Sequence, residues 1–178
     1  FDGELSPPFT IVEPANWRAP IIFNSPHSGS VYPAEFLNVS RIDLAALRRS
    51  EDSFMDELIG HLSERGFPVV TVNFPRSYVD VNREPYELDP RMFTGRLPSF
   101  ANTRSMRVAG GLGTIPRVVG DGQEIYRERL SVDDALGRER AIAERASMPE
   151  ALTHLRNPAT YRVEESPGVA LQREEAEK

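Results

Sequence analysis

Residues 21–33 have the sequence Ile-Ile-Phe-Asn-Ser-Pro-His-Ser-Gly-Ser-Val-Tyr-Pro, and this stretch decides the fold class. The mostly apolar residues 20–24 predict a short buried strand, and the Pro-His-Ser-Gly turn that follows predicts its end. His27 therefore lies at the end of a strand, where open α/β folds place their chemistry. A histidine in a turn more often caps a backbone group than binds a ligand, so position alone leaves both interpretations open.

The residues after this strand predict a βαβ unit. Ser40 and Asp43 are typical of a helix start. Apolar residues then recur at three- and four-residue steps to about Arg65, and Gly66 is a typical helix end. The β-branched residues 69–74 predict a second buried strand. Two strands joined in this way are normally parallel, so we expect an α/β fold.

The remaining segments are less regular. Residues 1–18 contain three prolines and predict an irregular lead-in. Residues 84–123 are rich in glycine and proline and predict a long connection, whose Gly-Gly-Leu-Gly run at 110–113 suits a flexible lid or a plain loop equally well. A helix is expected from Ser131 to about Arg145. We expect one domain over residues 1–178.

Composition excludes several classes of protein. The chain has 178 residues, enough to bury a substantial core. Its formal net charge of −6 argues against a general nucleic-acid binder, and the absence of cysteine excludes disulfides and thiolate metal sites. No apolar run approaches the roughly 20 residues of a membrane span, and the first residues do not resemble a secretion signal. We therefore expect a cytoplasmic protein that binds neither nucleic acid nor membrane.

Glu51 and Asp52 form a second candidate group. Glu51 falls on the apolar stripe of the expected helix, where a carboxylate is costly unless it is paired or bound to a cation. Arg48 and Arg49 offer such pairing. Because the two carboxylates lie about 100° apart on a helix, only one should face a given site. A neutral imidazole with a carboxylate suits zinc, which takes three protein ligands in catalytic sites.

A third candidate group follows the second strand, and it consists of Arg76, Asn82 and Arg83. The planar fork of arginine binds carboxylates bidentately, and asparagine adds a further donor. Salt bridges to acidic neighbours such as Asp80 explain the spacing equally well. The convergence of two arginines and an asparagine at a second strand end favours a site for a small acidic molecule.

Five stretches together resemble a known family in order and in spacing. They are Ser25–Gly29 with Tyr32-Pro33, Glu51–Leu58, Pro75–Pro90, Gly111–Pro116 and Ile125–Arg127. The chain thereby resembles the N-formylglutamate amidohydrolase family, whose members release formate from N-formyl-L-glutamate in histidine breakdown. That family is similar to the zinc carboxypeptidases and aspartoacylase. The resemblance implies a three-layer α/β/α, zinc-exopeptidase-like architecture with a mixed, partly parallel central sheet.

The resemblance also implies a zinc site. His27 would be one ligand, and one carboxylate of the pair at 51 and 52 would be the second. The motif alignment favours Asp52, whereas the helical stripe favours Glu51. The third ligand is expected in an Asp-Cys-His-Ser-Met-Pro stretch of the family, of which only Ser147-Met-Pro149 remains here.

The same resemblance implies roles for four further residues. Arg76 would polarise the scissile carbonyl, Asn82 and Arg83 would hold a substrate carboxylate, and Glu174 matches the position of the general base. Family members are substantially longer than this chain. We therefore expect that the chain is shortened, or that segments are missing, after about residue 140.

The activity implied is a metal-dependent hydrolysis of N-formyl-L-glutamate to glutamate and formate. Two alternatives remain open. The chain is an amidohydrolase for another N-acyl amino acid or peptide-like amide, or it is a non-catalytic binder of acidic ligands that lacks a complete metal site. The hydrolase interpretation requires that His27 and Arg83 open into a common cavity.

Overall fold

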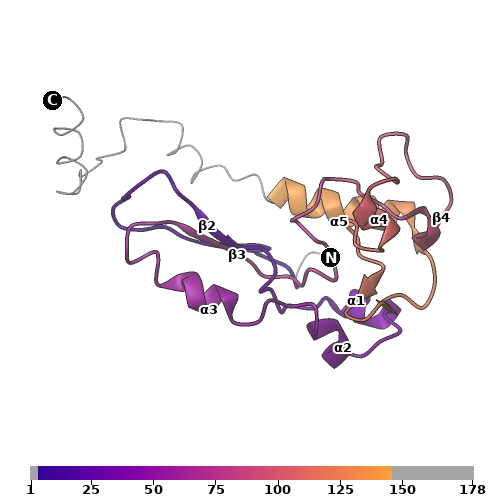
Figure 1. Cartoon of the computed structure of the whole chain (residues 1–178), viewed down its shortest axis with the longest axis horizontal. Coiled ribbons are helices and arrows are strands. Elements are labelled where there is room, and N and C mark those ends of the chain that lie inside the picture. Colours follow the sequence, from indigo (N-terminus) through magenta and orange to yellow (C-terminus); the bar gives the residue numbers. More distant parts are fainter. Residues whose placement is uncertain (1–3, 146–178) are drawn as a thin grey trace.

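The computed structural model describes residues 4–145, in which the largest sheet has three strands (Figure 1). The strands are β1 (Phe9–Val12), β2 (Phe23–Ser25) and β3 (Val69–Val72), in the order β1-β3-β2. β3 pairs in parallel with β2 and antiparallel with β1. The predicted α/β class with a mixed, partly parallel sheet is confirmed, whereas the three-layer arrangement and the likeness to zinc exopeptidases stay predictions.

The expected irregular lead-in is wrong at β1. The prolines of this segment flank the strand, with Pro7 and Pro8 before it and Pro14 after it, so none interrupts its backbone pairing. β1 uses the edge of β3 that β2 leaves open, and Phe9 lies opposite Val72. Long-range pairing, not local sequence, therefore makes this segment a strand.

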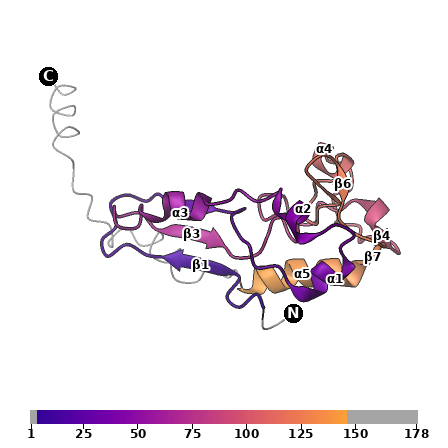
Figure 2. The ribbon, with the colours of Figure 1, turned by 90° about the horizontal axis from the view of Figure 1, so that it is seen from below.

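Three short helices connect β2 to β3: α1 (Ala34–Val39), α2 (Leu44–Arg48) and α3 (Met55–Gly60). Asp43 caps α2 through the amide of Ala46, as its position suggested. α3 contacts both β2 and β3, and Figure 2 shows it on one side of the sheet. The crossover thus joins two parallel strands, in agreement with the predicted βαβ unit.

The single long helix expected between Asp43 and Arg65 is wrong, because the chain leaves the helical path between α2 and α3. The amide of Asp52 donates a hydrogen bond to the carbonyl of His27 at 3.0 Å, outside any helix. Phe54 then takes a left-handed backbone conformation, with φ of 64°, just before α3 begins. Such a conformation is costly for a bulky residue, so the contact with the His27 turn outweighs the local helical pattern.

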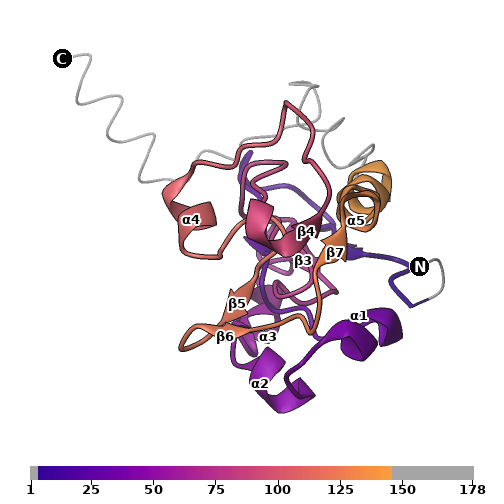
Figure 3. The ribbon, with the colours of Figure 1, turned by 90° about the vertical axis from the view of Figure 1, so that its right-hand side faces the viewer.

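The C-terminal half consists of short elements followed by one longer helix. Its elements are η1 (Pro90–Met92), β4 (Phe93–Thr94), α4 (Met106–Ala109), β5 (Val118–Val119), β6 (Gln123–Glu124), β7 (Leu130–Ser131) and α5 (Val132–Arg145). β4 pairs in parallel with β7, and β5 forms an antiparallel hairpin with β6. Figure 3 shows α5 and α4 on opposite sides of these strands. The helix predicted from residue 131 to 145 is confirmed.

Aromatic side chains join the two halves in the core. Phe36 of α1 and Phe74 both contact the ring of Tyr78, and all three are buried. The guanidinium of Arg138, on α5, lies 4.7 Å from the centre of the Tyr78 ring, a cation–π contact that attaches α5 to this cluster. Within residues 4–145 no helix has both the length and the apolar content of a membrane span, and the cytoplasmic location stays a prediction.

Gly29 shows why the turn that carries His27 needs a glycine. A Cβ atom at this position would collide with the carbonyl oxygen of Phe74 and with the main chain of Asn73. The amide of Val31 donates to the carbonyl of Asn73 at 2.9 Å and holds the turn there. The missing side chain thus lets the turn lie directly against the chain that leaves β3.

We expect Gly29→Ala to lower the free energy of unfolding by about 2–3 kcal/mol, because the backbone must shift to admit the methyl group. Gly60→Ala is the matched control, since Gly60 ends α3 with no atom near its Cβ position and alanine there favours the helix by up to about 1 kcal/mol. Urea denaturation of both variants measures the difference. Equal stabilities of the two variants would contradict the close approach at Gly29.

Glu139 links α5 to the segment that follows the third candidate group. Its Oε2 accepts a hydrogen bond from the amide of Tyr86 at 3.1 Å, and the residue is only 8% exposed. Oε1 has no hydrogen-bond partner within residues 4–145. Burial raises the pKa of Glu139 to about 7, against the opposing effect of the hydrogen bond from Tyr86.

The stability of the fold should therefore fall as the pH rises from about 4.5 to about 7. The pKa of Glu139 in the folded protein lies above its ordinary value. The contribution of protonated Glu139 to stability is therefore complete below the ordinary pKa and is lost as the pH rises through the folded-state pKa. Glu139→Gln should flatten this part of the pH profile, whereas Glu128→Gln, at an exposed position, should leave it unchanged. Thermal unfolding at pH 4–9 tests both variants, and an unaltered profile for Glu139→Gln would exclude Glu139 as its source.

Candidate active site

The carboxylate of Asp80 is the centre to which four predicted site residues converge. Its Oδ1 lies 2.9 Å from Nε2 of His27 and accepts the amide of Asn82 at 3.0 Å. Its Oδ2 lies 2.8 Å from Arg76 and 3.3 Å from Arg83. Asp80 is 2% exposed, so one buried negative charge connects the turn after β2 with the chain after β3.

The ionised form of Asp80 is strongly favoured. Burial alone would raise its pKa, but the hydrogen bond from His27 and the charge and hydrogen bond of Arg76 outweigh burial and lower the pKa to about 2. Sequence reasoning treated Asp80 only as a salt-bridge partner. The sequence feature that indicated this role was the position of Asp80, four residues after Arg76 and three before Arg83, which lets both arginines reach its carboxylate.

The ring of His27 lies between two carboxylates. Nε2 is next to Asp80, and Nδ1 lies 3.3 Å from Oδ2 of Asp52. If the proton sits on Nε2 and is donated to Asp80, the lone pair of Nδ1 faces Asp52. Of the two carboxylates proposed as alternatives, the structure brings Asp52 to the imidazole.

Glu51 makes different contacts. Its side chain is 2% exposed and accepts hydrogen bonds from the hydroxyl of Tyr32 at 2.7 Å and from Nε of Arg48 at 3.2 Å. Burial, together with the hydrogen bond to Glu51 and the charge of Glu51, raises the pKa of the Tyr32 phenol. Glu51 is therefore paired within the protein, which was one of the two options that the sequence left open for it.

The donor atoms at His27 suit part of a zinc site. The 3.3 Å between Nδ1 of His27 and Oδ2 of Asp52 is close to the separation of two ligands of one tetrahedral zinc ion. Metal-binding histidines usually donate their other ring N–H to a carboxylate, which is the place of Asp80. Within residues 4–145 no group of three or more His, Cys, Asp or Glu side chains could hold a metal. The sequence identifies no third protein ligand, and both the Ser147-Met-Pro149 remnant and Glu174 lie outside the described residues.

A cavity of about 340 Å³ borders this group. Asp52, Arg76 and Asp80 line it, and its apolar wall includes Leu112 and Val119. His27 and Arg83 are not among its lining residues. The expectation that His27 and Arg83 open into a common cavity is therefore wrong. Both instead contact the carboxylate of Asp80, which lies in the cavity wall.

Arg76 and Arg83 differ in how many of their N–H groups are engaged within the protein. Arg76 lines the cavity, and one of its amino groups contacts Asp80. Arg83 is 10% exposed and also donates to the carbonyls of Leu112 at 3.0 Å and Asn82 at 2.7 Å. Three donor groups of Arg83 are thus engaged within the protein, whereas Asn82 is exposed.

The glycine run at 110–113 is held on both sides of Gly113. The carbonyl of Leu112 accepts from Arg83, and the amide of Thr114 donates to the carbonyl of Glu87 at 2.8 Å. A Cβ atom on Gly113 would collide with the same Glu87 carbonyl. These contacts describe a fixed loop that forms part of the cavity wall, and they favour the plain loop over the flexible lid.

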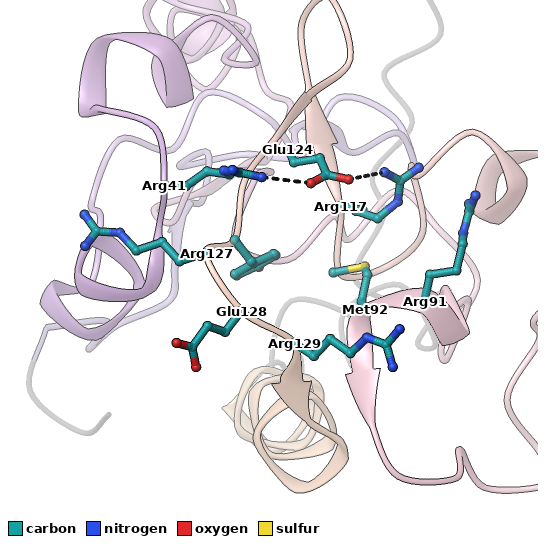
Figure 4. Close-up of a pocket in the computed structure, with 9 residues that line it drawn as sticks. Arg41, Arg91, Met92, Arg117, Glu124, Arg127, Glu128 and Arg129 are labelled. Carbon is teal, nitrogen blue, oxygen red and sulfur yellow. Dashed lines mark hydrogen bonds and ion pairs between the residues drawn. The ribbon is translucent and has the colours of Figure 1, made fainter.

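A second cavity, of about 290 Å³, is rich in arginine but lies around other elements (Figure 4). Glu124 accepts hydrogen bonds from Arg41 and Arg117, and Asp89 accepts from Arg117 and Arg91. Figure 4 shows that Arg41 and Arg117 approach the Glu124 carboxylate from its two sides, whereas the guanidinium groups of Arg127 and Arg129 point away from it. The groove is therefore a network of ion pairs.

Comparison with known proteins shows the family and the fold of the chain. The model of the N-formylglutamate amidohydrolase family matches residues 19–144, and the chain belongs to this family. Its fold is similar to the crystal structure of N-formylglutamate amidohydrolase from Ralstonia eutropha JMP134, with a TM-score of 0.72 and 28% sequence identity. The match covers 84% of this chain and 54% of that protein, so the chain spans about half the length of its structural relative. No curated protein sequence matches the chain.

We expect Asp80→Asn to lower the free energy of unfolding at pH 7 by about 3–5 kcal/mol, because the partly buried Arg76 and Arg83 lose their buried counter-charge. The folded-state pKa of Asp80 lies below its ordinary value, so its contribution is present above about pH 4 and is lost as the pH falls through 2. The difference from wild type should therefore shrink in acid. Denaturation at pH 7 and pH 2.5 measures it, with the exposed Glu64→Gln as control; a constant difference would rule out the charge as its origin.

Proposed function

We propose that this chain is a metal-dependent amidohydrolase that cleaves N-formyl-L-glutamate to L-glutamate and formate, a step of histidine breakdown. Family membership over residues 19–144 supports this reaction class. The single observation that carries the proposal is the meeting of His27, Asp52 and Arg76 around Asp80 at the wall of a cavity. An imidazole, a carboxylate and an arginine are the groups that amide hydrolysis by this family would use.

His27, through Nδ1, and Asp52 would hold zinc together with a third ligand that the sequence does not identify. Bound zinc would supply a water that is acidic near neutral pH and would polarise the formyl oxygen. Asp80 keeps the His27 ring in one orientation and places its other nitrogen toward Asp52. The protein thus provides the tautomer and the direction that a ligand histidine needs.

Arg76 would donate a hydrogen bond to the formyl oxygen while negative charge develops on it. A strong donor of this kind contributes roughly 3–4 kcal/mol to the transition state. Asn82 and Arg83 would hold one substrate carboxylate. Glu174 would take a proton from the attacking water and return it to the leaving nitrogen.

The test is hydrolysis of N-formyl-L-glutamate by the full chain, with zinc added and after treatment with a chelator. We expect turnover that the chelator abolishes and zinc restores, and a loss of at least about a hundredfold in kcat/KM for His27→Ala and Arg76→Ala. His61→Ala is the control, because this histidine is exposed, lies beside the carbonyl of Leu58 and is not among the residues that line the cavity.

Two results would count against the proposal. Full activity of His27→Ala would remove its metal role, and preferential hydrolysis of N-acetyl or N-succinyl amino acids would assign a different substrate. Binding of L-glutamate without zinc and without turnover would instead support the non-catalytic binder.

A further inference from the structure

The cavity carries one more cation than the expected site residues account for. Among the residues that line it, Arg49 and Arg76 bear positive charge. N-formyl-L-glutamate has two carboxylates, and only one is assigned to Asn82 and Arg83. We propose that Arg49 binds the second, side-chain carboxylate of the substrate and so sets the preference for an acidic amino acid; this inference rests on the proposed function.

The carboxylates of the cavity wall do not neutralise Arg49. Glu51 is paired with Tyr32 and Arg48. Asp52 and Asp80 face the ring of His27, and Asp80 also faces Arg76. Each acidic group of the wall thus has a partner other than Arg49.

The ion pair that Arg49 makes in the absence of substrate is easily replaced. NH2 of Arg49 lies 2.8 Å from Oδ2 of Asp121. The side chain of Asp121 is 84% exposed and that of Arg49 is 52% exposed, and ion pairs between such exposed groups contribute about 0–1 kcal/mol. A substrate carboxylate can therefore take the place of Asp121 at little cost.

The backbone around Arg49 places its guanidinium at the edge of the cavity. Arg49 is the C-terminal cap of α2, two residues before Glu51 in the wall. Across the chain, Gly120 has φ of 47°, and a Cβ there would lie only 3.8 Å from Cζ of Arg49. The hairpin turn thus passes directly beside the guanidinium, next to the apolar Val119 of the wall. An apolar surface with a cation at its rim matches the methylene groups and terminal carboxylate of a glutamyl side chain.

Binding of L-glutamate and of L-glutamine, its neutral isostere, tests the inference without turnover. Calorimetry on the full chain should show that Arg49→Gln weakens glutamate binding roughly tenfold or more and changes glutamine binding less than about twofold. Asp121→Asn should tighten glutamate binding, because it removes the competing carboxylate. Circular dichroism and thermal unfolding confirm that each variant is folded.

The matched control is Arg41→Gln. Arg41 is likewise 52% exposed and pairs with a half-exposed carboxylate, Glu124, at 3.0 Å, but in the groove of Figure 4. This variant should bind glutamate as the wild type does. An equal effect of the two substitutions, or equal weakening of glutamate and glutamine by Arg49→Gln, would overturn the inference.

Hydrolysis separates this inference from the proposed function. With N-formyl-L-glutamate, Arg49→Gln should raise KM about tenfold or more with little change in kcat, whereas the KM for N-formyl-L-glutamine should stay nearly constant. Wild-type turnover with an unchanged KM in Arg49→Gln would overturn the role of Arg49 and leave the amidohydrolase intact. No turnover by the wild type, with glutamate binding that still depends on Arg49, would overturn the amidohydrolase and leave the carboxylate site.

Discussion

The buried negative charge of Asp80 is the constraint on which the rest of the site depends. Burying an ion is costly, and the cost is offset only if partners surround it closely. His27, Arg76 and Arg83 provide these partners, together with the amide of Asn82. The turn after β2 and the chain after β3 must therefore lie side by side, and the parallel pairing of β2 with β3 brings their ends to the same edge.

The local sequence pattern was sufficient to predict β2, β3 and α5. The two parallel strands and α5 carry clear apolar or capping signals, and the prediction of both was confirmed. β1 was missed because its pairing with β3 joins segments about 60 residues apart. The long helix was predicted wrongly because the pattern continues through residues 49–54, where the contact between Asp52 and the His27 turn redirects the chain.

The candidate site was predictable in its members but not in its arrangement. The sequence named His27, Asp52, Arg76 and Arg83, and all four belong to one connected group. It did not show that Asp80 would be the shared partner, or that Glu51 would turn toward Tyr32 instead. Both features depend on which side chains meet in three dimensions. The helical periodicity used for Glu51 and Asp52 does not apply, because the chain leaves the helical path between α2 and α3.

Arg83 connects the charged centre of the site to its apolar wall. One guanidinium touches both the Asp80 carboxylate and the main chain at Leu112. The glycine loop is in turn fastened to Glu87 through Thr114. The shape of the cavity and the electrostatics of the groups around Asp80 are therefore mechanically coupled. A neutral residue at position 83 would alter both together, by a single substitution.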